Sequence, residues 1–212
     1  MKKTLLIAAA ALISASAFAQ TVTSANIVGY VKVETVSGFK IVSQQFEGGD
    51  ATPTGLFGDT LPLGSKIYQF DPTSGYSVSE YTTIFLAGDA WDTALDLSSG
   101  SFWVESSSIN TNTFSGDVGM ADSVTNNIVP GFSMQVYPYP VTVAISDLDI
   151  TPTLGDKIYK FNPGSGYSVS EYTTIFLAGD AWDTELTFEV GDGFWYENAA
   201  ATTNVWIEAK PF

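Results

Sequence analysis

A tryptophan enclosed by two aspartates is the pattern in this sequence with the clearest chemical meaning, and it occurs twice. An indole ring can stack on the apolar face of a sugar, while carboxylates beside it accept hydrogen bonds from the sugar hydroxyls. A carbohydrate-binding site, one in each copy, is therefore one candidate role for the pattern. Its members are Asp89, Trp91 and Asp92, repeated as Asp180, Trp182 and Asp183.

Two other roles are open for the same residues. The aspartates could supply oxygen ligands to Ca²⁺, although a calcium site gathers six or more oxygens and each segment offers only two carboxylates. Alternatively, Trp91 and Trp103 fill the core of a small domain and the aspartates shape a turn, because large aromatic side chains dominate burial in such domains. We expect the core role and no cofactor, and we keep sugar binding as the alternative and Ca²⁺ as a third option.

The residue types that are missing limit the chemistry further. The chain has no Cys and no His, which excludes a Ser-His-Asp triad, a thiol nucleophile and an imidazole ligand for zinc. A carboxylate pair of the glycosidase type and a Ser-Lys arrangement remain, and no spacing in the sequence favours either. We therefore expect a protein that is not an enzyme, with no catalytic residue and no metal ligand to name.

Two apolar motifs accompany the aspartates. Phe102-Trp103 recurs as Phe194-Trp195, within segments that have the character of strands. The run Ile84-Phe85-Leu86-Ala87 is expected to be buried, as four consecutive apolar residues suit a strand covered on both faces. If the run were exposed instead, it would be a binding surface.

Charge and the N-terminus restrict the partners and the location. The formal net charge is −15, so the protein would repel nucleic acid and anionic membrane surfaces. Residues 1–19 have the features of a bacterial secretory signal peptide, namely Lys2 and Lys3, an apolar stretch, and Ala17-Phe18-Ala19 as the cleavage site. We expect a secreted or cell-surface protein, or a periplasmic one, without a membrane span, that binds itself or a surface polysaccharide.

The mature chain consists of two copies of one unit, 20–121 and 122–212. Residues 64–97 align with residues 155–188, and residues 74–93 are identical to residues 165–184. A period of about ninety residues indicates a duplicated domain or half-domain rather than a short solenoid repeat. Recent copying and a shared constraint both explain the identical segment.

Each unit is predicted to be all-β and to form a sandwich or a barrel-like fold. Residues 66–70 and 76–81 are rich in β-branched and aromatic residues, and the Pro and Gly between them predict a hairpin, which recurs in the second unit. Short helices are expected at 56–57 and 145–148. Further strands are expected at 26–35, 39–43, 101–105 and 111–115 in the first unit, and at 127–129, 132–137, 193–197 and 204–209 in the second.

Five short motifs together carry a resemblance to a known group of proteins. They are "SANIVGYVKV", "GFKIVS", an Ile-Tyr-x-Phe strand, a Trp-Asp turn and a Gly-x-Phe-Trp strand. With these motifs the chain resembles uncharacterised exported β-proteins of verrucomicrobial type. The resemblance implies an exported β-fold and transfers no catalytic residue. We therefore expect a secreted structural or adhesive protein of the cell surface or extracellular matrix; a carbohydrate-binding module is the alternative, and a glycosidase-type enzyme comes third.

Overall fold

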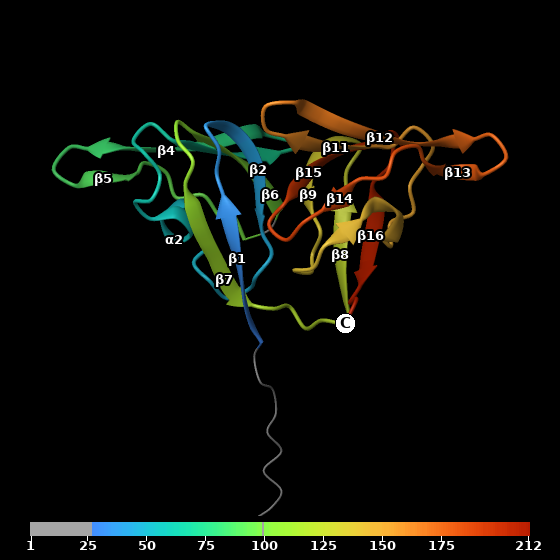
Figure 1. Ribbon diagram of the computed structural model, residues 1–212, viewed down its shortest axis with the longest axis horizontal. Coiled ribbons are helices and arrows are strands. Elements are labelled where there is room, and N and C mark those ends of the chain that lie inside the picture. The colour runs from blue at the N-terminus through green and yellow to red at the C-terminus, as the bar shows by residue number, and fades with distance from the viewer. Residues whose placement is uncertain (1–26, 99) are drawn as a thin grey trace, which may run out of the picture.

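The structure is a computed structural model that describes residues 27–98 and 100–212, so the predicted signal peptide at 1–19 lies outside the described residues. The described chain is all-β, as predicted, and its strands form sandwich-like layers. Two five-stranded sheets lie side by side in one layer, and a two-stranded ribbon packs below each (Figure 1). In the described chain no helix has the length and apolar character needed to cross a membrane.

The first sheet has the strand order β2-β6-β3-β4-β5, and every neighbouring pair is antiparallel. The ribbon that covers it consists of β1 and β7, with the short helix α2 beside it. Helix α2 begins after Thr52, whose hydroxyl accepts a hydrogen bond from the Gly55 amide, and Pro53 occupies its first turn. The bounds are β1 (Val28–Glu34), β2 (Gly38–Gln44), α2 (Pro53–Phe57), β3 (Lys66–Asp71), β4 (Gly75–Ile84), β5 (Gly88–Trp91), β6 (Gly100–Ser106) and β7 (Thr111–Asp117).

The second sheet has the order β9-β15-β11-β12-β13, which is the order of the first sheet with each strand replaced by its repeat. Its ribbon is β8 with β16, and a small β10-β14 pair with the 3-10 helix η2 stands where the first unit has α2. The bounds are β8 (Ser123–Ile128), β9 (Gly131–Val136), β10 (Val143–Ala144), η2 (Ile145–Asp147), β11 (Lys157–Asn162), β12 (Gly166–Ile175), β13 (Gly179–Trp182), β14 (Thr187–Phe188), β15 (Gly193–Asn198) and β16 (Asn204–Ala209).

The predicted hairpin turns form for the reasons that the sequence suggests. The Asp71 carboxylate accepts hydrogen bonds from the Thr73 and Ser74 amides, both at 2.8 Å. Gly75 closes the turn with a φ of 83°, a conformation that glycine adopts without a steric penalty. These contacts fix the register that places Tyr76 opposite Phe70.

Each unit has its own core between the inner face of its sheet and its ribbon. In the first unit Phe57 packs edge-to-face on Phe114, with ring centroids 5.4 Å apart. In the second unit Phe188 stacks on Phe194 at 4.5 Å, and Trp206 is fully buried beside them. The two cores are separate clusters, so each unit buries enough apolar surface to have a core of its own.

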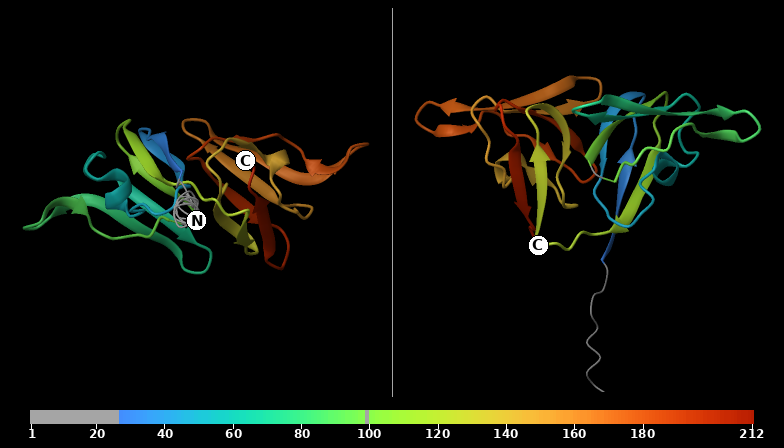
Figure 2. Two further views of the ribbon diagram at one scale, coloured as in Figure 1. Left: turned by 90° about the horizontal axis from the view of Figure 1, so that it is seen from below. Right: turned by 180° about the vertical axis from the view of Figure 1, so that it is seen from behind.

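The two units also share an interface, which Figure 2 shows from below and from behind. The Ser43 amide donates to the Gly191 carbonyl at 2.9 Å, and the Ser101 hydroxyl donates to the Gln135 carbonyl at 2.9 Å. Gly193 allows this approach, because a Cβ there would lie 2.1 Å from the Cβ of Ser101. Gly193 therefore lies where the units meet.

Two expectations about the repeated hairpin differ from the structure. Gly-Asp-Ala-Trp forms a fifth strand, β5 or β13, at the edge of each sheet, where we expected a turn. The prediction that the run 84–87 is buried is wrong: Phe85 is 88% exposed and Leu86 is 92% exposed. The run forms the tip of the β4-β5 hairpin, which extends beyond the ribbon below it, and the β12-β13 hairpin projects at the opposite end (Figure 1).

Candidate functional site

The aspartates and tryptophan of the first predicted site serve the fold of the hairpin. Trp91 is only 8% exposed, and its indole nitrogen donates to the Gly58 carbonyl at 3.1 Å. Its ring packs on Phe57, within the core of the first unit. The Asp89 carboxylate accepts from the Thr83 hydroxyl at 2.7 Å, and the Asp92 carboxylate accepts from the Glu80 amide at 2.9 Å. These side chains are thus joined to the hairpin rather than to one another.

The second copy repeats the carboxylate contacts but packs its tryptophan less tightly. Asp180 accepts from the Thr174 hydroxyl at 2.7 Å, and Asp183 accepts from the Glu171 amide at 3.0 Å. Trp182 is partly buried, with its ring 6.4 Å from that of Tyr196. No group of three or more acidic side chains that could hold a metal occurs in residues 27–98 and 100–212.

A larger aromatic surface lies on the outer faces of the two sheets, which are the faces turned away from the two unit cores. Ten rings gather there, and we call them the aromatic belt. Strand alternation puts them on this face, because their neighbours Ile67, Phe102 and Val104 point into the core. The belt consists of Phe39, Tyr68, Phe70, Tyr76 and Trp103 from the first unit and Phe132, Tyr159, Phe161, Tyr167 and Trp195 from the second.

The ten rings form a closed circuit of contacts. From Phe39 the circuit passes to Tyr68, Tyr76, Phe70, Trp195, Phe132, Tyr159, Tyr167, Phe161 and Trp103, and then returns to Phe39. Successive ring centroids are between 4.8 and 6.3 Å apart, within the range in which aromatic pairs attract. The circuit crosses between the units twice, so the belt belongs to the whole chain.

The two crossings exchange phenylalanines between the units. Phe70 of the first unit packs on Trp195 of the second, at 4.9 Å between centroids. Phe161 of the second unit packs on Trp103 of the first, at 4.8 Å. Ile41 and Met134 fill the space below, in a third buried cluster that both units build. The aromatic contacts therefore help to hold the two units in one arrangement.

The belt surrounds two open hollows. The first has a volume of about 540 Å³, and the second has a volume of about 390 Å³. Four rings at their rims remain about half exposed: Phe39 (44%), Tyr76 (52%), Phe132 (47%) and Tyr167 (48%). The first hollow is lined by Phe39, Tyr68, Tyr76, Val78, Trp103 and Phe161, and the second by Phe70, Phe132, Tyr159, Tyr167 and Trp195.

A polar group stands at one side of each hollow. The Tyr68 hydroxyl donates to the Glu105 carboxylate at 2.5 Å, and the Tyr159 hydroxyl makes the equivalent bond to Glu197. Burial, together with the neighbouring Glu105 carboxylate, raises the pKa of Tyr68 to about 12. Both tyrosines are therefore neutral donors at physiological pH. Beside the first hollow, Lys66 pairs with Glu80 at 3.5 Å.

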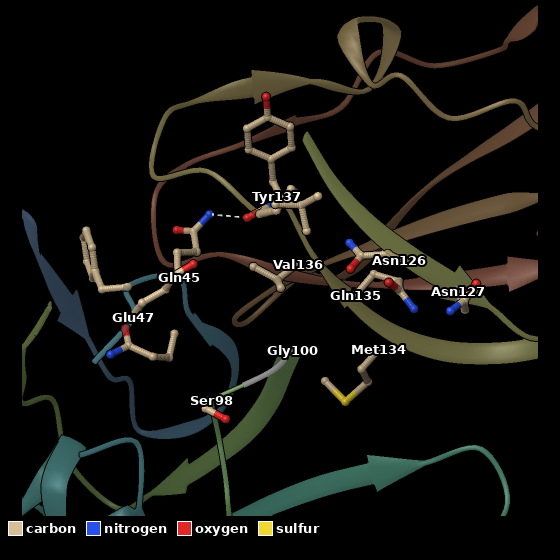
Figure 3. A pocket seen from close by; sticks show the side chains of 14 residues that line it. Gln45, Glu47, Ser98, Gly100, Asn126, Asn127, Met134, Gln135, Val136 and Tyr137 are labelled. Atoms are coloured by element: carbon tan, nitrogen blue, oxygen red, sulfur yellow. Dashed lines mark hydrogen bonds between the residues drawn. The ribbon is translucent and has the colours of Figure 1, made fainter. Parts of the chain in front are cut away.

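A polar cavity of about 330 Å³ lies elsewhere between the units (Figure 3). Gln45 spans the junction there, donating to the Tyr137 carbonyl at 2.7 Å and accepting from the Gly191 amide at 2.7 Å. Gln44 is 3% exposed, and its amide oxygen and nitrogen have no protein partner. Ordered water commonly satisfies buried amides of this kind.

The chemistry of the belt is that of a contact surface. Its rings offer apolar area and π-faces, and the carboxylates nearest to it are held by tyrosine hydroxyls. The expectation that Trp103 fills the core of its unit is wrong: Trp103 lies on the outer face, in the belt, where Phe161 of the second unit packs on it. Sequence reasoning also missed that the packing of Phe70 and Phe161 crosses between the units. The available signal was the apolar outer face of the hairpin, where Tyr68, Phe70 and Tyr76 stand in place of polar residues.

The chain matches no protein-family model, no curated protein and no solved structure.

Proposed function

We propose that this protein is a non-enzymatic structural or adhesive protein of the cell surface or extracellular matrix, and that it attaches through the aromatic belt. The observation that carries the proposal is the closed circuit of ten rings, with four rim rings about half exposed. The solvent face of an antiparallel sheet is ordinarily polar. Contiguous exposed apolar surface of this kind marks a site of interaction.

We propose a non-enzymatic role because of the residue types that the chain contains. The whole chain has neither the imidazole nor the thiol that most nucleophilic and acid-base mechanisms use. Glu105 and Glu197, the carboxylates nearest to the belt, accept hydrogen bonds from tyrosines and serve to orient those rings. The same proposal places the protein outside the cell, at the cell surface, or in the periplasm.

The test removes rim rings without disturbing the strands. Tyr76 and Tyr167 are changed together to Thr, which retains a high β-strand propensity. Retention of the secreted protein in the cell-surface and matrix fraction should fall at least tenfold relative to the wild type. The matched control is Tyr30→Thr, at a 72% exposed tyrosine of the β1 ribbon outside the belt, and retention should be unchanged. Equal retention of both variants would refute the role of the belt.

Carbohydrate binding is the second candidate, favoured by the tyrosine and carboxylate pairs beside the belt tryptophans. In the first hollow the Tyr68 and Glu105 pair could bind sugar hydroxyls while Trp103 stacks on the ring. Titration of polysaccharides against tryptophan fluorescence would detect such a site, because Trp103 and Trp195 line the hollows. A saturable shift that disappears in the Tyr76→Thr, Tyr167→Thr variant would favour this candidate. Retention on cells without any shift would favour a protein partner.

A further inference from the structure

The tips of the two long hairpins are the most exposed large apolar residues among the described residues. Phe85 and Leu86 are 88% and 92% exposed, and Phe176 and Leu177 are 89% and 93% exposed. In each tip the turn is closed by one backbone bond, from the Ala87 amide to the Ile84 carbonyl in the first and its equivalent in the second, both at 3.0 Å. Each tip thus presents a phenylalanine and a leucine to the solvent at the end of a two-stranded arm.

The two tip leucines adopt a strained backbone conformation. Leu86 and Leu177 have φ values of 68° and 69°, and within residues 27–98 and 100–212 they are the only residues other than glycine with positive φ. The third position of such a turn is normally occupied by Gly or Asn, because other residues clash there. A strained residue whose side chain contacts nothing in its own chain points to a role outside that chain.

The hollows of the aromatic belt are suited to receive these side chains. An apolar cavity of about 150 Å³ holds one benzene-sized group, so hollows of about 540 and 390 Å³ have room for a phenylalanine and a leucine together. Their walls are aromatic rings and Val78, with the polar Tyr68 and Tyr159 hydroxyls already bound to carboxylates. Each chain carries two tips and two hollows, so the numbers match.

A tip cannot reach the hollow of its own unit. Phe85 and the rim residue Tyr76 belong to one hairpin, nine positions apart along β4, which separates them by roughly 30 Å at 3.3 Å per residue. The arms also extend in opposite directions, away from the middle of the molecule where the belt crosses between the units (Figure 1). A tip and a hollow can therefore meet only between two molecules.

We propose that the partner of the aromatic belt is a second copy of this chain, whose hairpin tip inserts Phe85 and Leu86, or Phe176 and Leu177, into a hollow. The inference rests on the proposed function, since it names the occupant of the same belt. Tip and hollow are different surfaces, so the contact is heterologous, and repetition of such contacts builds open chains or layers unless the rotation closes a ring. An assembling protein of this kind is suited to a structural role outside the cell.

The size of one contact predicts how the assembly behaves. A phenylalanine and a leucine bury on the order of 300 Å² on the tip, and the hollow loses a similar area, which together is below the ~1,200 Å² of a stable interface. One contact is therefore weak, and assembly depends on the two tips and two hollows of each chain acting together. Because the chain carries a net charge of −15, copies repel one another at low salt, so assembly should increase with salt concentration.

The experiment compares two variants that each lack one half of the contact. The tip variant carries Phe85→Ser, Leu86→Gly, Phe176→Ser and Leu177→Gly. The hollow variant carries Tyr76→Thr and Tyr167→Thr. Sedimentation velocity at rising protein and salt concentrations should show assembly of the wild type and loss of assembly in both variants. Circular dichroism and unfolding in urea establish that each variant is folded.

Mixing the two variants gives the decisive result. Intact hollows of the tip variant and intact tips of the hollow variant should restore mixed complexes, at least tenfold above the complexes that either variant forms alone. No complexes in the mixture, a wild type that stays monomeric at every concentration, or a tip variant that assembles normally would overturn the inference. Tip-dependent binding to phosphatidylglycerol vesicles by a monomeric protein would also overturn it.

The outcomes keep this inference apart from the proposed function. If the tip variant loses assembly but keeps its retention on cells, while the hollow variant loses retention, the belt attaches to another molecule as well and the proposed function stands. If the tip variant assembles like the wild type but the hollow variant loses retention, the inference fails and the proposed function survives. If the hollow variant retains both properties, both proposals fail.

Discussion

Replacing the two tip leucines by glycine should make the protein more stable. Leu86 and Leu177 adopt φ values near 70°, a left-handed conformation that costs roughly 1–2 kcal/mol for a residue with a Cβ. Glycine adopts it freely but loses more conformational entropy on folding, by roughly 0.4–1 kcal/mol. The side chains are more than 90% exposed, so almost no buried area is lost. The net gain is about 0.5–1 kcal/mol at each tip.

The assay is unfolding in urea at a protein concentration where the chain is monomeric. For Leu86→Gly with Leu177→Gly we expect a midpoint shift equivalent to about 1–2 kcal/mol at an unchanged m-value. In a thermal scan the same gain corresponds to a rise in Tm of about 2–8 °C. The matched control is Leu86→Ala with Leu177→Ala, which keeps both Cβ atoms and therefore the strain, and should leave stability within about 0.5 kcal/mol.

One result would refute the reasoning. If the glycine variant were destabilised by more than about 0.5 kcal/mol, the leucines would be making contacts within their own chain, and the tips would not be free arms. Stabilisation together with loss of self-assembly would instead show that these positions sacrifice stability for binding, as functional positions often do.

Three further perturbations test other parts of the structure. Trp91→Ala should lower the free energy of unfolding by about 3–5 kcal/mol, because the Trp91 ring is buried in the core. Trp182→Ala should lower it by less. If both substitutions left the free energy of unfolding nearly unchanged, the assignment of Trp91 to the core would be contradicted. Gly193→Ala should destabilise the protein by about 1–3 kcal/mol through the clash with Ser101, and combining it with Ser101→Gly should recover part of the loss. The contribution of Tyr68 to stability should be constant below pH 10 and be lost between pH 10 and about 12, because unfolded tyrosine loses its proton there while Tyr68 in the fold keeps it; Tyr68→Phe should make the fall in stability across that pH range shallower in urea titrations at each pH.

The sequence predicted the hairpins well because their determinants are local. The β-branched and aromatic residues at alternating positions in 66–70 and 76–81, with Pro and Gly between them, specify two strands and a turn without reference to distant residues. It missed β5 and β13 because Gly-Asp-Ala-Trp has no alternating pattern. Each of these strands pairs along one edge only, β5 with β4 and β13 with β12.

The belt and the tips could not be predicted from the sequence for a different reason. A run such as Ile84-Phe85-Leu86-Ala87 indicates burial on average, and only the position of the turn puts two of its residues in solvent. Likewise, Phe70 and Phe161 have the pattern of residues that pack within their own unit. Their exchange between units depends on how the two sheets meet, which no local pattern encodes.

The identical twenty residues, 74–93 and 165–184, include both tips of the proposed contact and part of the rim of each hollow. They contain the rim tyrosines Tyr76 and Tyr167 and both tips, together with the strands that hold the tips apart from the belt. Core packing accounts for part of the identity, because Trp91 and Trp182 pack on the equivalent Tyr81 and Tyr172. Outside the segment their neighbours differ, since Trp91 packs against Phe57 whereas Trp182 meets Tyr196. Each tip must fit either hollow of another copy, so both arms need the same residues. Each rim tyrosine must likewise receive either tip, so both rims need the same residue. If synonymous codon positions in the two segments have diverged, this shared demand explains the identity; if they match, recent copying is sufficient.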